Sequence, residues 1–224
     1  MNKLLKALLC AGLVFGLVGC GSSGGETKYN NEPKELTVEE SGYFLSSDTS
    51  PYIMYSVKVT NPNEDYYVNS AAINVTAYDA EGNILASTPQ SWGPIAPGES
   101  VYFAGQADCN QVAPANVEFE VTNTKDDYSE NPDREVLTEL EVSNTNIMQD
   151  QFSSSVTGVV KNTMDEDIGG SWVSVIFYKE GAMIGGKFTF TEGISSGGEM
   201  PFDISIYQMP EGYDDYKVYA YNWF

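Results

Sequence analysis

The chain has 224 residues, of which 11 are Lys or Arg and 32 are Asp or Glu, so its formal net charge at pH 7 is −21. This charge disfavours binding to nucleic acid and to anionic lipid headgroups, and the absence of histidine excludes Ser-His-Asp and Cys-His catalysis and imidazole-ligated metal sites. With 42% hydrophobic residues, the chain does not have the composition of a disordered protein and can form packed cores.

The first 19 residues are typical of a secretory signal peptide. Lys3 and Lys6 supply the positive start, and residues 7–18 are apolar but too few to span a bilayer comfortably. The segment ends in a sequence that resembles a bacterial lipobox, formed by Leu17, Val18, Gly19 and Cys20. Lipobox signals are cut before a cysteine whose thiol carries a diacylglyceryl group. The alternative is an ordinary signal peptide followed by a chance cysteine.

Lipidation of Cys20 predicts that the protein is anchored to the cell membrane on its extracytoplasmic face. The Gly- and Ser-rich residues 21–25 follow as a flexible tether, and loss of the signal peptide brings the net charge to about −23. Cys109 then remains as the last thiol, which excludes an intrachain disulfide and a thiolate-rich zinc site. We expect Cys109 to be a structural residue rather than a reactive one.

Beyond the tether, segments of one type recur in one order at a spacing of about 100 residues. The matching pairs are 55–61 with 156–162, 73–78 with 173–178, 98–99 with 198–199, and 117–121 with 216–220. The longer segments alternate apolar and polar residues with period two and are separated by turn-forming residues, as β-strands are. These patterns predict an all-β fold of two tandem Ig-like antiparallel β-sandwich domains.

The same alternation predicts the domain limits and the two cores. The predicted divisions are a signal peptide at 1–19, a lipidated cysteine with its tether at 20–35, a first sandwich at 36–124, an acidic linker at 125–134 and a second sandwich at 135–224. The first core is expected to contain Val57, Val59, Ile73, Val75, Ala77, Phe119 and Val121, and the second Gly158, Val160, Val173, Val175, Phe177, Val218 and Ala220.

One strand-and-turn pattern resembles a known family. A strand ends in Tyr78-Asp79 and a Pro97-Gly98-Glu99 turn precedes a later strand; the second repeat has Tyr178-Lys179 and Gly197-Gly198-Glu199. The pattern resembles the FxLYD-type Ig-like domains of bacterial surface lipoproteins, although both repeats depart from the Phe and Leu of the naming motif and the second also lacks its Asp. The resemblance implies a sandwich fold and an extracytoplasmic setting, and it brings no catalytic residues.

Two other patterns come close to ligand-binding motifs. Residues 181–188 resemble a phosphate-binding loop, but Phe188 stands where such a loop needs Ser or Thr, so we expect a Gly-rich hairpin turn. The acidic residues 165–167 and 126–127 lack the full spacing of an EF-hand, and solvated loops are the expectation, with calcium left open. We predict no cofactor, no metal site and no catalytic residue, and therefore no enzyme.

The last strand carries the pattern with functional content. By its match to 117–121, it should point Tyr216, Val218 and Ala220 inward and Tyr219, Tyr221 and Trp223 outward. Outward aromatic residues spaced by two can stack on sugar rings or contact a protein; the alternative is that they pack within the chain. We predict a lipid-anchored binding or structural module that recognises cell-wall glycan or extracellular carbohydrate. The alternative is a protein-interaction subunit accessory to a membrane transporter or sensor.

Overall fold

The computed structural model describes residues 32–49, 51–149 and 154–223. Within them, the chain forms fourteen strands and one 3-10 turn, and no α-helix. The elements of the first half are β1 (Thr37–Leu45), β2 (Ile53–Thr60), β3 (Tyr67–Val68), β4 (Ala72–Tyr78), β5 (Ile84–Ser91), β6 (Ser100–Ala107) and β7 (Asn116–Val121). A connecting segment holds η1 (Lys125–Asp127) and β8 (Tyr128–Ser129). The second half contains β9 (Glu141–Gln149), β10 (Ser154–Lys161), β11 (Gly170–Lys179), β12 (Ala182–Phe190), β13 (Glu199–Ile206) and β14 (Asp215–Trp223).

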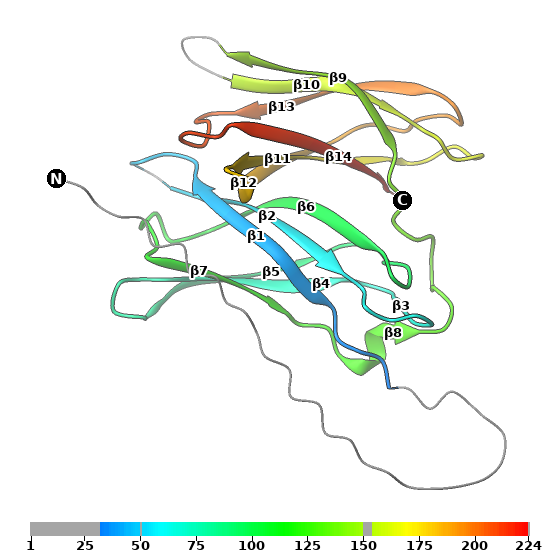
Figure 1. Cartoon of the computed structure of the whole chain (residues 1–224), viewed down its shortest axis with the longest axis horizontal. Helices are drawn as coiled ribbons and strands as arrows, with labels where there is room; N and C mark the ends of the chain where they lie inside the picture. The colour runs from blue at the N-terminus through cyan, green and yellow to red at the C-terminus, as the bar shows by residue number, and fades with distance from the viewer. Residues whose placement is uncertain (1–31, 50, 150–153, 224) are drawn as a thin grey trace, which may run out of the picture. The chain divides into compact units, whose positions relative to one another are not determined.

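The same sheet topology occurs in both halves (Figure 1). The first half has antiparallel sheets in the orders β1-β2-β6 and β5-β4-β7, and the second half has β9-β10-β13 and β12-β11-β14. The register repeats as well, because Val75 pairs with Phe119 in the first half and Val175 pairs with Val218 in the second. The prediction of an all-β fold built from antiparallel sandwich sheets is confirmed.

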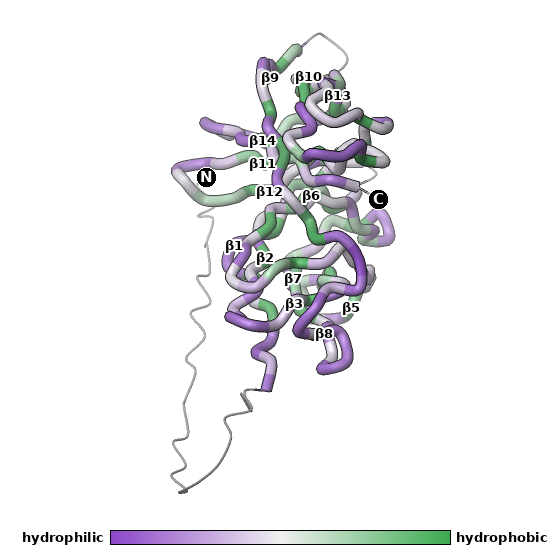
Figure 2. Tube along the Cα trace, turned by 90° about the vertical axis from the view of Figure 1, so that its right-hand side faces the viewer, coloured by the Kyte–Doolittle hydropathy of each residue, from purple (hydrophilic) through white to green (hydrophobic). Residues whose placement is uncertain are grey.

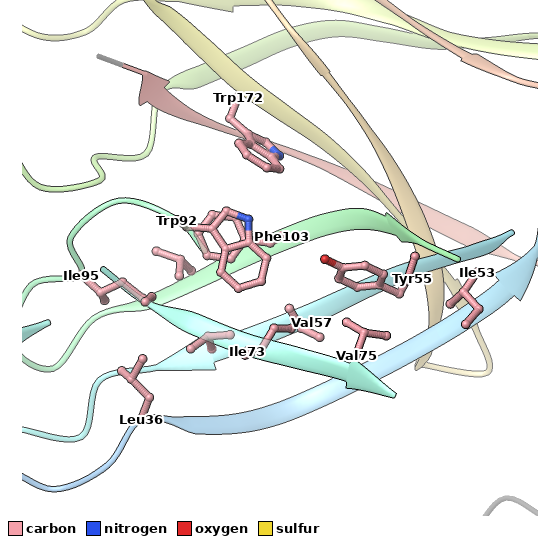
Figure 3. Close-up of a cluster of buried hydrophobic side chains, with 14 of the residues drawn as sticks. Leu36, Ile53, Tyr55, Val57, Ile73, Val75, Trp92, Ile95, Phe103 and Trp172 are labelled. Atoms are coloured by element: carbon pink, nitrogen blue, oxygen red, sulfur yellow. The ribbon is translucent and has the colours of Figure 1, made fainter. Parts of the chain in front are cut away.

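Both predicted cores form between the two sheets of each half. Every residue predicted for the first core is buried or packed against it, and so is every residue predicted for the second. Figure 3 shows the first core, where Tyr55, Val57, Ile73 and Val75 lie between the sheets. Burial of these side chains on one face of each strand explains why the alternating pattern located them.

An asparagine holds the end of the second strand of each half in the same way. The side-chain amide of Asn61 donates to the carbonyl oxygens of Tyr66 and Ile95, at 2.8 and 3.2 Å. Its counterpart Asn162 donates to those of Glu166 and Ile194, at 2.8 and 3.0 Å. Both amides are fully buried, so each satisfies carbonyl groups that would otherwise be buried without a partner.

The two halves pack against each other through one sheet of each. β12 lies against β1, β2 and β6, and the described residues from Pro33 onward form a single compact unit. Gly186 allows the close approach, because a Cβ atom there would lie 2.9 Å from Ala104 Cβ and 3.3 Å from Ser56 Cβ, both in the first half. A Cβ on Gly42 would likewise lie 2.1 Å from the Met183 carbonyl oxygen. That each half folds alone stays a prediction.

The connecting segment is bound to the first half. β8 pairs with β3, and the Tyr128 hydroxyl accepts a hydrogen bond from the Leu36 amide at 3.0 Å. Hydrophilic residues surround β8 in Figure 2. The segment predicted as an acidic linker therefore has defined structure, and it brings residues 134–138 to the boundary between the halves.

Candidate functional site

The three aromatic residues predicted to form a binding face differ widely in exposure. Tyr219, Tyr221 and Trp223 alternate along β14 and pair with Ser174, Trp172 and Gly170 of β11. Tyr221 is only 2% exposed, Tyr219 is half-buried, and Trp223 is 41% exposed. Of the three rings expected to be open to solvent, only that of Trp223 is exposed. The rings of Tyr221 and Tyr219 are covered by the first half.

Tyr219 and Tyr221 connect the halves instead. The Tyr219 ring stacks on Tyr102 of β6 with centroids 4.2 Å apart and planes 8° from parallel. The Tyr221 hydroxyl accepts a hydrogen bond from the Tyr102 backbone N–H at 3.0 Å. Burial raises the pKa of both phenols. Their outward direction was predicted correctly, but the surface they meet belongs to the same chain.

Trp223 belongs to an aromatic group at the start of β11 and the ends of β12 and β14. Its ring lies 5.1 Å from that of Phe190 and 5.7 Å from that of Trp172, between centroids. Phe188 stacks on Trp172 at 4.7 Å. Phe190 is 48% exposed, so Phe190 and Trp223 are open while Trp172 and Phe188 support them from beneath. Sequence analysis missed Phe190, although its alternation with Phe188 along a strand was visible.

A cavity of about 160 Å³ lies beside Trp223. Residues from both halves and from the connecting segment line this cavity, namely Ser91, Trp92, Gly93, Arg134, Leu137, Asn222 and Trp223. Trp92 is buried and stacks on Phe103, with centroids 4.1 Å apart. Figure 3 shows Trp172 reaching toward this pair from the second half. The cavity therefore has a rigid aromatic wall and forms only where the halves meet.

Hydrogen bonds fix the backbone on both sides of Arg134. The Asp133 N–H donates to the Asn69 side-chain oxygen at 3.2 Å, and the Leu137 N–H donates to the Pro94 carbonyl oxygen at 2.8 Å. Asn222 accepts from the Thr138 N–H at 2.7 Å and donates to the Val136 carbonyl oxygen at 3.1 Å. The connecting segment is thus anchored to both halves at the cavity.

Arg134 is the single arginine of the chain. It is exposed, and within the described ranges no carboxylate lies at ion-pair distance from it. Its guanidinium group carries five N–H donors in a planar fork that matches a carboxylate. Sequence analysis did not single it out; its uniqueness in an acidic chain was the available signal.

A second cavity, of about 310 Å³, opens near the start of β14 and is lined by Glu40, Tyr102, Tyr178, Gly181, Asp215 and Lys217. The Lys217 ammonium lies 5.3 Å from the centroid of the Tyr178 ring. Because charges of both signs line this cavity, it has no clear preference for a charged ligand.

The remaining motifs have structural explanations. The Gly-rich hairpin turn predicted for residues 181–188 is confined to Glu180 and Gly181, and residues 182–188 belong to β12. Asp167 accepts a hydrogen bond from the Ser196 N–H at 2.9 Å, which connects its loop to the loop between β12 and β13. No group of three or more metal-ligating side chains occurs among the residues that the structure describes. Cys109 is buried, and burial raises the pKa of its thiol, which fits the predicted structural role.

The predicted signal peptide and lipobox, including Leu17, Val18, Gly19 and Cys20, lie outside the described residues. In the part of the chain that is described, no helix is long and apolar enough to cross a membrane.

Comparisons with known proteins give little on which to base a function. No protein-family model matches the chain, and no curated protein matches it. Among solved structures, it is similar to red sea bream transglutaminase, with 9% identity over 79% of this chain and 27% of that protein, at a TM-score of 0.26. That protein is an enzyme, which contradicts the prediction of no enzymatic activity, and we withdraw the prediction. The likeness is too weak to assign an activity in its place.

Proposed function

We propose that this protein is a lipid-anchored, extracytoplasmic module that binds carbohydrate at the open aromatic end of β12 and β14. The anchor rests on the lipobox-like residues 17–20 and the tether after them. The repeated sheet topology is consistent with the resemblance to FxLYD-type Ig-like lipoprotein domains, which we keep as part of the proposal.

The observation that carries the proposal is the pair of exposed rings beside a cavity. Phe190 and Trp223 are held 5.1 Å apart by contacts with Trp172. Aromatic side chains present flat apolar faces that stack on the C–H faces of sugar rings. The adjoining cavity adds polar groups, among them Ser91 and Arg134, that can hydrogen-bond sugar hydroxyls. Side chains that only pack in a core would be buried, whereas Phe190 and Trp223 are both exposed.

Binding of immobilised glycans by the full chain tests the proposal. Trp223→Ala and Phe190→Ala should each reduce retention on cell-wall glycan at least tenfold, because an exposed aromatic anchor concentrates binding energy. Tyr207→Ala is the matched control: Tyr207 is 80% exposed and lies outside the aromatic group, so its loss should change nothing.

Retention that is equal in wild type and Trp223→Ala would contradict the site. A blank result on all glycans, together with capture of a purified membrane-protein partner that requires Trp223, would replace carbohydrate by the alternative of a protein-interaction subunit.

The membrane anchor is tested separately. Cys20→Ser should release the protein into the medium or leave an uncleaved precursor, since the lipid attachment depends on one thiol. Membrane-fraction protein that is still processed after Gly19 in the Cys20→Ser variant would contradict the lipid anchor.

A further inference from the structure

We propose that Arg134 makes the cavity beside Trp223 selective for sugars that carry a carboxylate group. This inference rests on the proposed carbohydrate-binding function and adds the chemical class of the ligand. It starts from the juxtaposition of the single arginine with an exposed tryptophan in one cavity.

The charges around the cavity support an anionic ligand. Of the seven residues that line it, Arg134 is the only charged one. The chain as a whole carries −21 and therefore repels anions at long range. A carboxylate that enters the cavity meets a guanidinium group to which no carboxylate of the described residues is paired. Local contact with Arg134 must then supply the attraction.

The geometry supports a sugar ring as the carrier of that carboxylate. A cavity of about 160 Å³ is smaller than the ~300–1,000 Å³ of sites for drug-sized ligands, and it is of the size of one ring. Trp223 offers a stacking face at its edge, and the fork of Arg134 can hold a carboxylate by two parallel hydrogen bonds. Backbone hydrogen bonds at residues 133 and 137 hold the segment that carries Arg134 beside the cavity.

The test measures binding of defined saccharides to the full chain in detergent by calorimetry. The probes are trigalacturonic acid, its methyl ester, a disaccharide that contains N-acetylmuramic acid, and a short peptide with a free C-terminal carboxylate. The ester has the same rings without the charge, and the two acidic saccharides distinguish a uronic acid from a lactyl ether as the source of the carboxylate.

The expected result is binding of at least one acidic saccharide, with at least about tenfold weaker binding of the ester and of the Arg134→Gln variant. Arg134→Lys should retain part of the affinity, since it keeps the charge and loses the fork. Lys179→Gln is the control, because it removes the same charge far from the cavity. Lys179 is the last residue of β11, whereas Gly170, the partner of Trp223, is the first.

Three outcomes would overturn the inference. Equal binding of trigalacturonic acid and its ester, lost in Trp223→Ala, would leave the carbohydrate function intact and remove the role of Arg134. Binding of the peptide alone would assign the cavity to protein termini. The absence of binding to every saccharide would remove both the inference and the proposed function.

Discussion

The central strands β4 and β11 occupy equivalent places in the two halves but face different surroundings. On β4, the outward Asn74 amide donates to the hydroxyls of Thr76 and Ser87, at 2.9 and 2.7 Å, on the outer sheet. On β11, the equivalent Ser174 accepts from the Ala104 N–H and from the Trp172 indole N–H, both at 3.1 Å. Residues 170–178 of β11 are all buried.

The difference explains why the outer face of the β12-β11-β14 sheet packs against the first half, whereas that of the β5-β4-β7 sheet stays polar. Thr76 on β4 corresponds to Ile176 on β11, and the exposed Glu120 on β7 corresponds to Tyr219 on β14. Both changes replace a polar outward residue with an apolar or aromatic one, which gains from burial against the first half. Trp223 is at the end of the same face of β14, beyond the part that the first half covers, and it is therefore exposed.

The largest effect is expected from a side chain placed in the contact between the halves. Gly42→Val should destabilise the chain by about 3 kcal/mol, because its Cβ would overlap the backbone of Met183 and Ile184 on β12 of the other half. Chemical denaturation measures the change. Gly82→Asn is the control, since a Cβ there meets nothing within 4 Å and asparagine tolerates its φ of +84°. Equal stability of the two variants would show that the halves do not pack as described.

Equivalent positions on β14 and β7 should respond differently. Tyr219→Ala should cost about 2 kcal/mol, since it removes a half-buried ring stacked on Tyr102. Glu120→Ala should change stability by less than about 0.5 kcal/mol, as exposed substitutions usually do. A Tyr102→Ala, Tyr219→Ala double-mutant cycle should give a coupling of about 1 kcal/mol. Additive losses would contradict a direct contact.

Removal of one hydroxyl should isolate the hydrogen bond between the halves. Tyr221→Phe should cost about 1 kcal/mol, because the Tyr102 N–H loses its acceptor at 3.0 Å. The equivalent residue of the first half, Thr122, is exposed, and Thr122→Ala should have almost no effect in the same thermal melt. A Tyr221→Phe variant as stable as wild type would mean that water replaces this acceptor.

The same phenol predicts a pH dependence. Burial, the largest cause, raises the pKa of Tyr221 above its ordinary value and outweighs the hydrogen bond from the Tyr102 N–H, which lowers it. The folded state therefore keeps a proton that the unfolded state releases near pH 10, so stability is full below about pH 10 and falls as the pH rises beyond it. Thermal melts from pH 8 to 11 should fall less steeply for Tyr221→Phe. Identical slopes would exclude Tyr221 as a source of the fall.

Only a modest stability effect is expected at the open end of the face. Trp223→Ala should cost about 1 kcal/mol, between the values for buried and exposed residues, because the ring is 41% exposed and touches Phe190 and Trp172. Tyr207→Ala should cost less. A loss of 3 kcal/mol or more in a thermal melt would place Trp223 in the core and remove it from the binding site.

The sequence predicted the strands and both cores because alternation with period two reports which face is buried. The pattern could not distinguish a strand face that is exposed to solvent from one that is buried against another part of the chain. The environments of Tyr219 and Tyr221 were ambiguous for that reason. The near-continuous apolar run from Trp172 to Tyr178 was the available sign of a strand buried on both faces.

The candidate site was only partly predictable. Trp223 was found from the alternation on the last strand, but Arg134 and Trp92 lie 89 and 131 residues away in the chain, and no local pattern connects them with it. Their proximity results from the packing of the halves and from the anchoring of residues 133–138. Gly185 and Gly186 were predicted in a hairpin turn but lie within β12, and their role in close packing required the structure.

The indole N–H signals of the chain's three tryptophans give the most direct test of the proposed site. Trp92 and Trp172 are buried, and Trp223 is open, so a ¹H–¹⁵N spectrum of the full chain in detergent should contain one indole signal that exchanges rapidly with solvent. On addition of a bound saccharide, that signal, assigned through Trp223→Phe, should shift most, with a smaller change at Trp172. Binding that leaves the Trp223 signal unmoved would contradict the account.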